Sequence, residues 1–147
     1  TMPKSADAKK ASPRIVKTVF LKAPPRHVWK FLTTAQGLAK WFHDAPHDLE
    51  EGGPFQLNTN TMDKEGQKLC WGRVLEMKPD ERLVHTFTHE WLKGEETTCT
   101  WTLEAVGAGT VLTLVHDGWP ETEGFVEIFS HDVGWDEHFV RLRRVVA

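Results

Sequence analysis

Six stretches of this chain show the alternation of apolar and polar residues that is typical of β-strands. Alternate side chains of a strand point to opposite faces of a sheet, so each stretch predicts one buried face and one wet face. Turn residues at Pro79–Asp80 and at Gly107–Ala108–Gly109 predict tight hairpins. The predicted strands are Arg14–Lys22, a short run through Phe55, Leu57 and Thr59, Lys68–Lys78, Arg82–Trp91, Thr97–Val106 and Thr110–Asp117.

Three helices are predicted where the apolar spacing becomes helical. Pro24 and Pro25 suit the start of a short helix, and Ala35–Phe42 predicts a second one. A long helix begins after Thr122, which can cap it, and continues to about Val146. At about 25 residues it would be about 37 Å long, enough to cross a small sheet. Its predicted buried stripe is Phe125, Ile128, Trp135, Phe139, Leu142 and Val146.

This order of elements predicts an α+β helix-grip fold. In it, a curved antiparallel six-stranded sheet wraps around a long C-terminal helix, and two short helices follow the first strand. Residues 1–13 are rich in Lys, Ala and Ser and are predicted to be a disordered leader, so a single domain is expected over residues 14–147.

The charge, the cysteine content and the apolar runs of the chain argue against several classes of protein. The formal net charge is only −3, with both signs mixed along the 147 residues, which argues against a nucleic-acid partner because such binding rests on clustered Lys and Arg. Cys70 and Cys99 are too few for a disulfide framework and lack metal-site spacing. No apolar run is long enough for a membrane span, and no secretory signal is visible. We therefore expect a cytoplasmic protein.

Several segments, taken in order, resemble one known family. They are APPRHVWKFLTTAQGLAKWF, GGPF, GRVLEMKPDERLVHTF, TWTLEAVGAGTVLTLVHDGW and GWDEHFVRL. Together they resemble the START-like (SRPBCC) superfamily, and within it the family named after the activator of Hsp90 ATPase, over Arg14 to Val146. The resemblance implies a ligand cavity between the sheet and the C-terminal helix.

The aromatic residues are the first candidates for lining such a cavity. The chain has seven Trp and eight Phe but no Tyr, and small-molecule sites are lined mostly by apolar and aromatic side chains. Gly72 and Gly134 would leave room beside them. Plain core packing is the alternative interpretation for most of these rings. The predicted aromatic lining is Trp41, Phe42, Phe55, Phe87, Trp91, Trp101, Phe129 and Trp135.

Histidines are the second group of candidates. His85 and His89 share a strand face but stand about 13 Å apart at 3.3 Å per residue, so one ion cannot bind both. His116 is predicted to point inward, and His131 lies on the helix stripe, so the two could face each other across the cavity. We expect His85, His116 and His131 to offer polar contacts in an apolar pocket. The alternative is that each imidazole is satisfied within the core.

The loop from His43 to Asp48 is the one segment that suggests a metal, because it holds two imidazoles and two carboxylates. No helix fixes these groups and no third His is near, so we interpret it as a solvated loop. We predict neither a metal nor a cofactor. The chain also lacks the short catalytic motifs HExxH, GxSxG and CxxC.

Three functions compete at this stage. The preferred one is a protein that binds an apolar or amphipathic, lipid- or aromatic-like small molecule. A cyclase or hydrolase in the same cavity would use His85, His116 or His131 as acid or base. A cofactor of an Hsp90-type chaperone is implied only by the resemblance; the founding member has a second domain that also engages the chaperone, so we do not expect this partner. A homodimer is left open.

Overall fold

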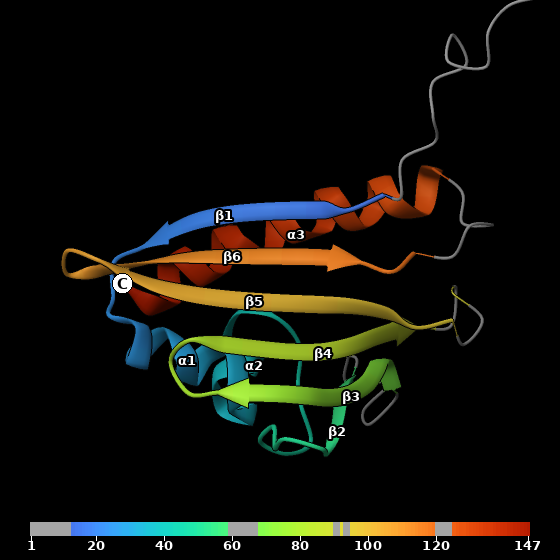
Figure 1. The fold of residues 1–147 in the computed structure, drawn as a ribbon, viewed down its shortest axis with the longest axis horizontal. Coiled ribbons are helices and arrows are strands. Elements are labelled where there is room, and N and C mark those ends of the chain that lie inside the picture. The colour runs from blue at the N-terminus through green and yellow to red at the C-terminus, as the bar shows by residue number, and fades with distance from the viewer. Residues whose placement is uncertain (1–12, 59–67, 90–91, 93–94, 120–124) are drawn as a thin grey trace, which may run out of the picture.

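The described residues form two layers, a six-stranded antiparallel sheet and three helices on one of its faces (Figure 1). The computed structural model describes residues 13–58, 68–89, 92, 95–119 and 125–147. Across the sheet the strand order is β1-β6-β5-β4-β3-β2. The strands are β1 (Ile15–Leu21), β2 (Pro54–Asn58), β3 (Lys68–Lys78), β4 (Arg82–His89), β5 (Thr97–Val106) and β6 (Gly109–Asp117).

The helices are α1 (Pro25–Thr33), α2 (Ala35–Trp41) and α3 (Phe125–Val146). In Figure 1, α3 passes behind the strands β1, β6 and β5, while α1 and α2 lie near the other half of the sheet. This arrangement confirms the predicted α+β helix-grip fold. The predicted cap at Thr122 and the end of the fourth predicted strand at Trp91 lie outside the described residues.

The register of the sheet confirms the predicted buried face. Cys99 pairs with His116 and Trp101 pairs with Leu114, and all four side chains are buried. Directly opposite residues of antiparallel strands point to the same face, so these side chains form part of the wall against which the helices pack. Burial raises the pKa of the Cys99 thiol, which is typical of an inert core cysteine.

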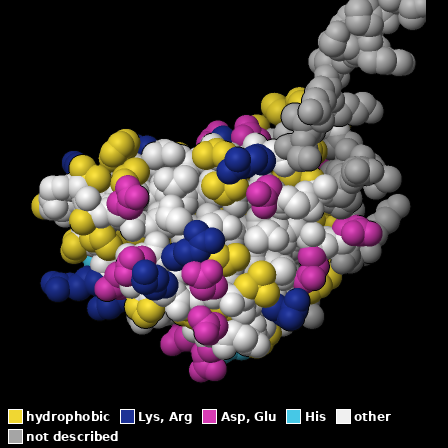
Figure 2. All heavy atoms as spheres, in the orientation of Figure 1, with side chains coloured by type: hydrophobic (Ala, Val, Ile, Leu, Met, Phe, Trp, Pro, Cys, Tyr) yellow, Lys and Arg dark blue, Asp and Glu magenta, His cyan; other side chains and the backbone are white. Residues whose placement is uncertain are grey.

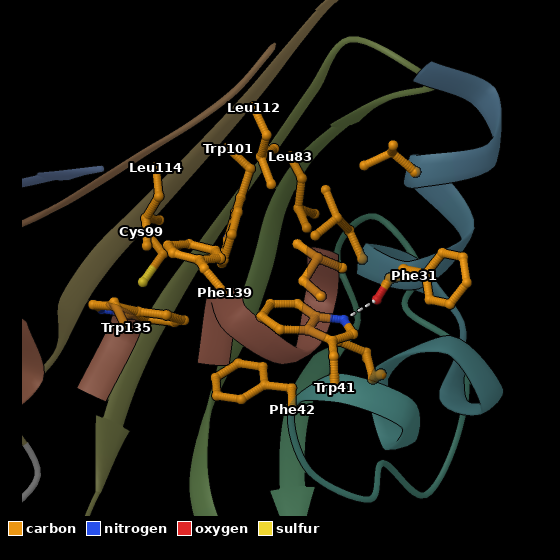
Figure 3. Packing of buried hydrophobic residues seen from close by; sticks show 14 of the residues in the cluster. Phe31, Trp41, Phe42, Leu83, Cys99, Trp101, Leu112, Leu114, Trp135 and Phe139 are labelled. Carbon is orange, nitrogen blue, oxygen red and sulfur yellow. Dashed lines mark hydrogen bonds between the residues drawn. The ribbon is translucent and has the colours of Figure 1, made fainter. Parts of the chain in front are cut away.

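The junction of α1 and α2 is closely packed. Thr34 ends α1 and caps α2, its hydroxyl accepting a hydrogen bond from the Gly37 amide at 3.0 Å. A Cβ at Gly37 would lie 2.3 Å from the carbonyl oxygen of Lys30, so only glycine allows this approach. The indole of Trp41 donates to the Phe31 carbonyl at 2.8 Å (Figure 3). These contacts hold Trp41 in the core.

One part of the predicted α3 stripe is wrong. Trp135, Phe139, Leu142 and Val146 are buried, but Phe125 is 77% exposed. Ten residues at 3.6 per turn carry Phe125 about 80° around the helix from Trp135, so it cannot share the buried face. None of the helices in the described part is long and apolar enough to cross a membrane.

Candidate functional site

Most of the predicted site residues form one continuous ring cluster on the helix-covered face of the sheet. Phe87 lies near its centre, with ring centroids 5.2 Å from His116, 6.2 Å from His131 and 6.3 Å from Phe55. Trp135 packs 5.4 Å from Trp101 (Figure 3). The cluster therefore joins β2, β4, β5 and β6 to α2 and α3. Its members from the predicted set are Trp41, Phe42, Phe55, His85, Phe87, Trp101, His116, His131 and Trp135.

Two predicted lining residues are not part of this cluster as described. Phe129 is 53% exposed and stacks on Phe125 at 5.8 Å. Six residues along the helix turn it about 120° from Trp135, which directs it away from the sheet. Trp91 lies outside the described residues.

His85 is held as a neutral imidazole by two hydrogen bonds. Its Nδ1 lies 2.8 Å from the Thr86 carbonyl oxygen, which can only accept, so Nδ1 carries the proton. Its Nε2 then accepts from the indole nitrogen of Trp101 at 3.0 Å. Burial lowers the pKa of His85 to about 4, and protonation would turn Nε2 into a donor facing another donor. The ring of Phe55 stacks on it at 3.8 Å.

His116 is held in the opposite tautomer. The indole of Trp135 donates to its Nδ1 at 3.1 Å, so the proton is on Nε2, which donates to the Thr97 hydroxyl at 2.7 Å. Thr97 in turn donates to the Phe87 carbonyl at 2.7 Å. Burial, with the neighbouring His131, His85 and His89, lowers the pKa of His116 well below its usual range. Both nitrogens of His85 and of His116 are thus occupied, and neither imidazole is placed to act as a base.

His131 and His89 contact each other directly. Their Nε2 atoms are 2.8 Å apart and their rings are stacked at 4.8 Å. The Nδ1 of His131 donates to the Glu127 carbonyl at 2.6 Å, so in the neutral pair His131 Nε2 accepts from His89. Burial lowers the pKa of both residues, that of His89 to about 4. The predicted approach of His116 and His131 is also present, with ring centroids 5.7 Å apart.

These histidines meet at one end of the sheet, which we call the imidazole end and define as Phe87, His89, His116, Trp119 and His131. β4 and β6 finish here, and α3 begins nearby. The ring of Trp119 packs at a tilt on His116, with centroids 4.4 Å apart, and lies 4.9 Å from His131. The sequence analysis missed Trp119 because it follows the last strand, where no periodic pattern marks a buried side.

A second histidine pair lies about two turns further along α3. His43 and His138 have ring centroids 5.2 Å apart, and Arg141 donates both to His138 Nδ1 and, at 3.0 Å, to the Trp41 carbonyl. Burial, with the neighbouring His43 and Arg141, lowers the pKa of His138 to about 4. Arg141 thereby ties α3 to the C-terminal end of α2, a structural role that helical spacing alone did not suggest.

The loop from His43 to Asp48 serves the fold in the described structure. Asp48 accepts a hydrogen bond from the Ala35 amide at 2.8 Å, and Asp44 pairs with Asn58 in an isolated β-bridge. The described residues contain no group of three or more His, Cys, Asp or Glu side chains that could hold a metal ion.

Among the described residues, every buried polar side chain is a threonine or a histidine. Buried charges are costly unless they are paired, and this interior holds none. Imidazoles held neutral can exchange hydrogen bonds with hydroxyl or carbonyl groups. The described part of the ring cluster is therefore uncharged when its imidazoles are neutral.

A hollow of about 310 Å³ lies elsewhere, between β1 and α3. Its lining mixes charged and apolar side chains, unlike the ring cluster. The lining residues are Lys17, Thr18, Val19, Asp136, Phe139, Val140 and Arg143.

Comparison with protein families gives one match. Residues 22–147 match the model described as Activator of Hsp90 ATPase homolog 1-like protein. None of the curated proteins compared with the chain matches it.

Solved structures share the fold. CalU16 from Micromonospora echinospora is 25% identical with a TM-score of 0.73, over 91% of this chain and 76% of its own. DynU16, from the dynemicin biosynthetic locus, is 24% identical with a TM-score of 0.75; the match covers 89% of this chain but only 46% of DynU16. An Aha1 from Colwellia psychrerythraea, solved as a dimer, is 22% identical with a TM-score of 0.73, over 91% of this chain and 96% of its own.

Proposed function

Because this chain belongs to the family of Activator of Hsp90 ATPase homolog 1-like proteins, whose fold commonly binds hydrophobic ligands, we propose that it binds an uncharged apolar or amphipathic small molecule. The proposed place is the imidazole end, where the ring cluster meets α3. The observation that carries the proposal is the direct contact of His89 with His131 beside Phe87 and Trp119. Aromatic surfaces would bind the apolar part of the ligand, and the imidazole pair would bind its polar group.

The chemistry of the pair supports an uncharged ligand. His131 is half-buried, and its Nε2 is engaged only with another imidazole among the hydrogen bonds of the described side chains. A hydroxyl could donate to His131 and accept from His89, replacing one hydrogen bond by two. A carboxylate would bring a charge into a site whose described side chains include no Lys or Arg, which is costly.

Nile red, an uncharged dye whose emission rises in apolar surroundings, tests this proposal. We expect saturable binding that raises the melting temperature with dye concentration, because a ligand of the folded form alone stabilises it. Naphthol should displace the dye more effectively than naphthoate. Binding that fails to saturate, or equal displacement by the charged and uncharged compounds, would contradict the proposal.

A pair of variants on α3 locates the site. His131→Leu replaces the imidazole by an apolar side chain of similar size. It should leave Nile red binding intact while weakening naphthol about tenfold, the loss expected for one hydrogen bond. Glu137→Gln changes an exposed residue of the same helix and should alter neither ligand. If both variants behave alike, the imidazole pair does not bind the polar group.

Acid–base catalysis by His131 is the second candidate. One contact favours it, since His131 and His89 share a hydrogen bond through which a proton could pass. In His85 and His116, by contrast, one nitrogen accepts from an indole and the other donates to Thr86 or Thr97. If His131 is the catalytic base, His131→Asn should abolish turnover of a substrate but retain Nile red binding. Turnover that survives this substitution would contradict catalysis by His131.

A further inference from the structure

The outer face of α3 carries a second line of apolar residues. Val126, Phe129, Val133 and Val140 are 70%, 53%, 38% and 52% exposed. They are spaced by three, four and seven residues, and exposed Ala147, directly after the end of α3, follows seven residues later. We call these five residues the outer seam.

Single exposed apolar residues are common on protein surfaces. A line of them at heptad spacing is different, because it is the pattern by which two helices pack along their length. The buried face of α3 already packs on the sheet and on α2, through Trp135, Phe139 and Leu142. The outer seam is therefore additional to what the fold requires.

The charges beside the seam indicate what could cover it. Acidic residues occupy the first part of α3, at Glu127, Asp132, Asp136 and Glu137, and basic residues occupy the last part, at Arg141, Arg143 and Arg144. A second α3 in antiparallel orientation would bring each acidic part against a basic part. A parallel copy would place like charges together.

We propose that the outer seam is a dimer interface, in which α3 packs antiparallel on α3 of a second copy of this chain. The two-fold axis lies at the level of His138. In this register Phe129 of one copy meets Ala147 of the other, and Val133 meets the aliphatic part of Arg143. Asp136 of each copy lies one helical turn from Arg143 of the other, so two symmetric ion pairs form. This proposal is independent of ligand binding.

The surroundings of Asp136 fit this arrangement. Lys17 binds Asp132 at 2.9 Å and Asp136 at 3.0 Å, which holds both carboxylates beside the seam. The hollow of about 310 Å³ between β1 and α3 borders the seam, and both Asp136 and Arg143 line it. It offers space for the charged side chains of the second copy.

The area of the proposed α3–α3 contact limits the affinity of the dimer. A 22-residue helix is about 33 Å long and about 10 Å across. A contact of two such helices is smaller than the standard interface of about 800 Å² per partner. We therefore expect a dimer that dissociates on dilution through the micromolar range, rather than an obligate one.

Charge reversal gives a sharp test by sedimentation equilibrium. Asp136→Arg and Arg143→Asp should each abolish the dimer, because each places like charges at both symmetric contacts. Mixing the two variants should restore a dimer, since Arg at position 136 then faces Asp at position 143 and the two native residues also face each other. Val133→Lys, on the seam, places a cation against Arg143 of the other copy at both symmetric contacts and should abolish the dimer without changing Asp136, the residue paired to Lys17.

Phe20→Ala serves as the control, because Phe20 is 65% exposed but lies on β1. It should leave the association unchanged, and circular dichroism should show every variant folded. A wild-type chain that is monomeric at millimolar concentration would overturn the proposal. So would charge-reversed variants that dimerise as wild type does, a mixture that fails to associate, or a dimer lost through Phe20→Ala.

Discussion

Two indole–imidazole contacts fix the protonation of the ring cluster. Trp101 donates to Nε2 of His85, whereas Trp135 donates to Nδ1 of His116. Since an indole can only donate, each contact leaves the histidine one position for its own proton. The two buried imidazoles are therefore opposite tautomers, and each is satisfied without a charge.

A double-mutant cycle on Trp101 and His85 measures one of these contacts. Trp101→Phe leaves the buried His85 Nε2 without its donor, and His85→Leu leaves the indole without its acceptor, so each change should cost about 1–3 kcal/mol beyond the loss of packing. The double variant should cost less than the sum by about 1 kcal/mol. Urea unfolding followed by circular dichroism gives the values. Additivity within about 0.5 kcal/mol would show that the contact contributes nothing.

At the scale of single residues, the sequence could predict direction but not partners. Strand alternation correctly directed His85 and His116 inward, because parity alone decides which face a strand residue occupies. Their tautomers depend on which indole approaches from another element, and no local pattern records that. Trp119 was missed for the same reason: it is buried, but its burial comes from tertiary contacts after the last strand.

At the scale of elements, α3 shows where sequence analysis is limited. The helix has two apolar lines, one through Trp135 and Phe139 and one through Phe129 and Val133. Helical spacing identifies both, but only packing decides which line faces the sheet. That is why Trp135 was correctly assigned to the buried face, whereas Phe129, which was predicted to line the cavity, lies on the exposed line.

Two glycines in helices should respond oppositely to alanine. At Gly37 a Cβ would lie 2.3 Å from the Lys30 carbonyl oxygen and 2.7 Å from the Phe31 Cα, so α1 and α2 must separate, and we expect a loss of about 1–3 kcal/mol. At Gly134 a Cβ would meet no described atom within 4 Å, so alanine should stabilise by up to about 1 kcal/mol. Urea unfolding of both variants checks this. A stabilising Gly37→Ala would contradict the close packing of α1 on α2.

At the scale of the whole molecule, charge is kept at the surface. The sheet side carries Lys and Arg interspersed with Asp and Glu (Figure 2), and the buried polar residues of the described part are only Thr and His. The buried histidines are then the groups whose lowered pKa values bear on stability in mild acid.

Stability should therefore decrease in mild acid. The pKa values of His85 and His89 are lowered to about 4 in the folded protein, whereas an unfolded histidine titrates near about 6.5. Between these values the unfolded chain binds more protons, so the free energy of unfolding falls as the pH falls, by roughly 1.4 kcal/mol per pH unit for each such histidine. Above about pH 6.5 this contribution is fully present.

Denaturant unfolding at about pH 7 and about pH 5 checks the sign and the slope. His89→Leu removes one of these protons and should make the slope shallower than in the wild-type chain. An unfolding free energy that is equal at both pH values would contradict the burial of neutral imidazoles.

Within the described part of the chain, the indole N–H groups of Trp41, Trp101, Trp119 and Trp135 donate to acceptors of the fold. Their ring protons should then exchange with deuterated water only when the surrounding structure opens. In a proton NMR spectrum, the exchange rate of each of these indole protons therefore measures how often the surrounding structure opens. Exchange at Trp135 reports the separation of α3 from β6, exchange at Trp101 reports opening around the β4–β5 contact, and exchange at Trp41 reports the separation of α1 from α2.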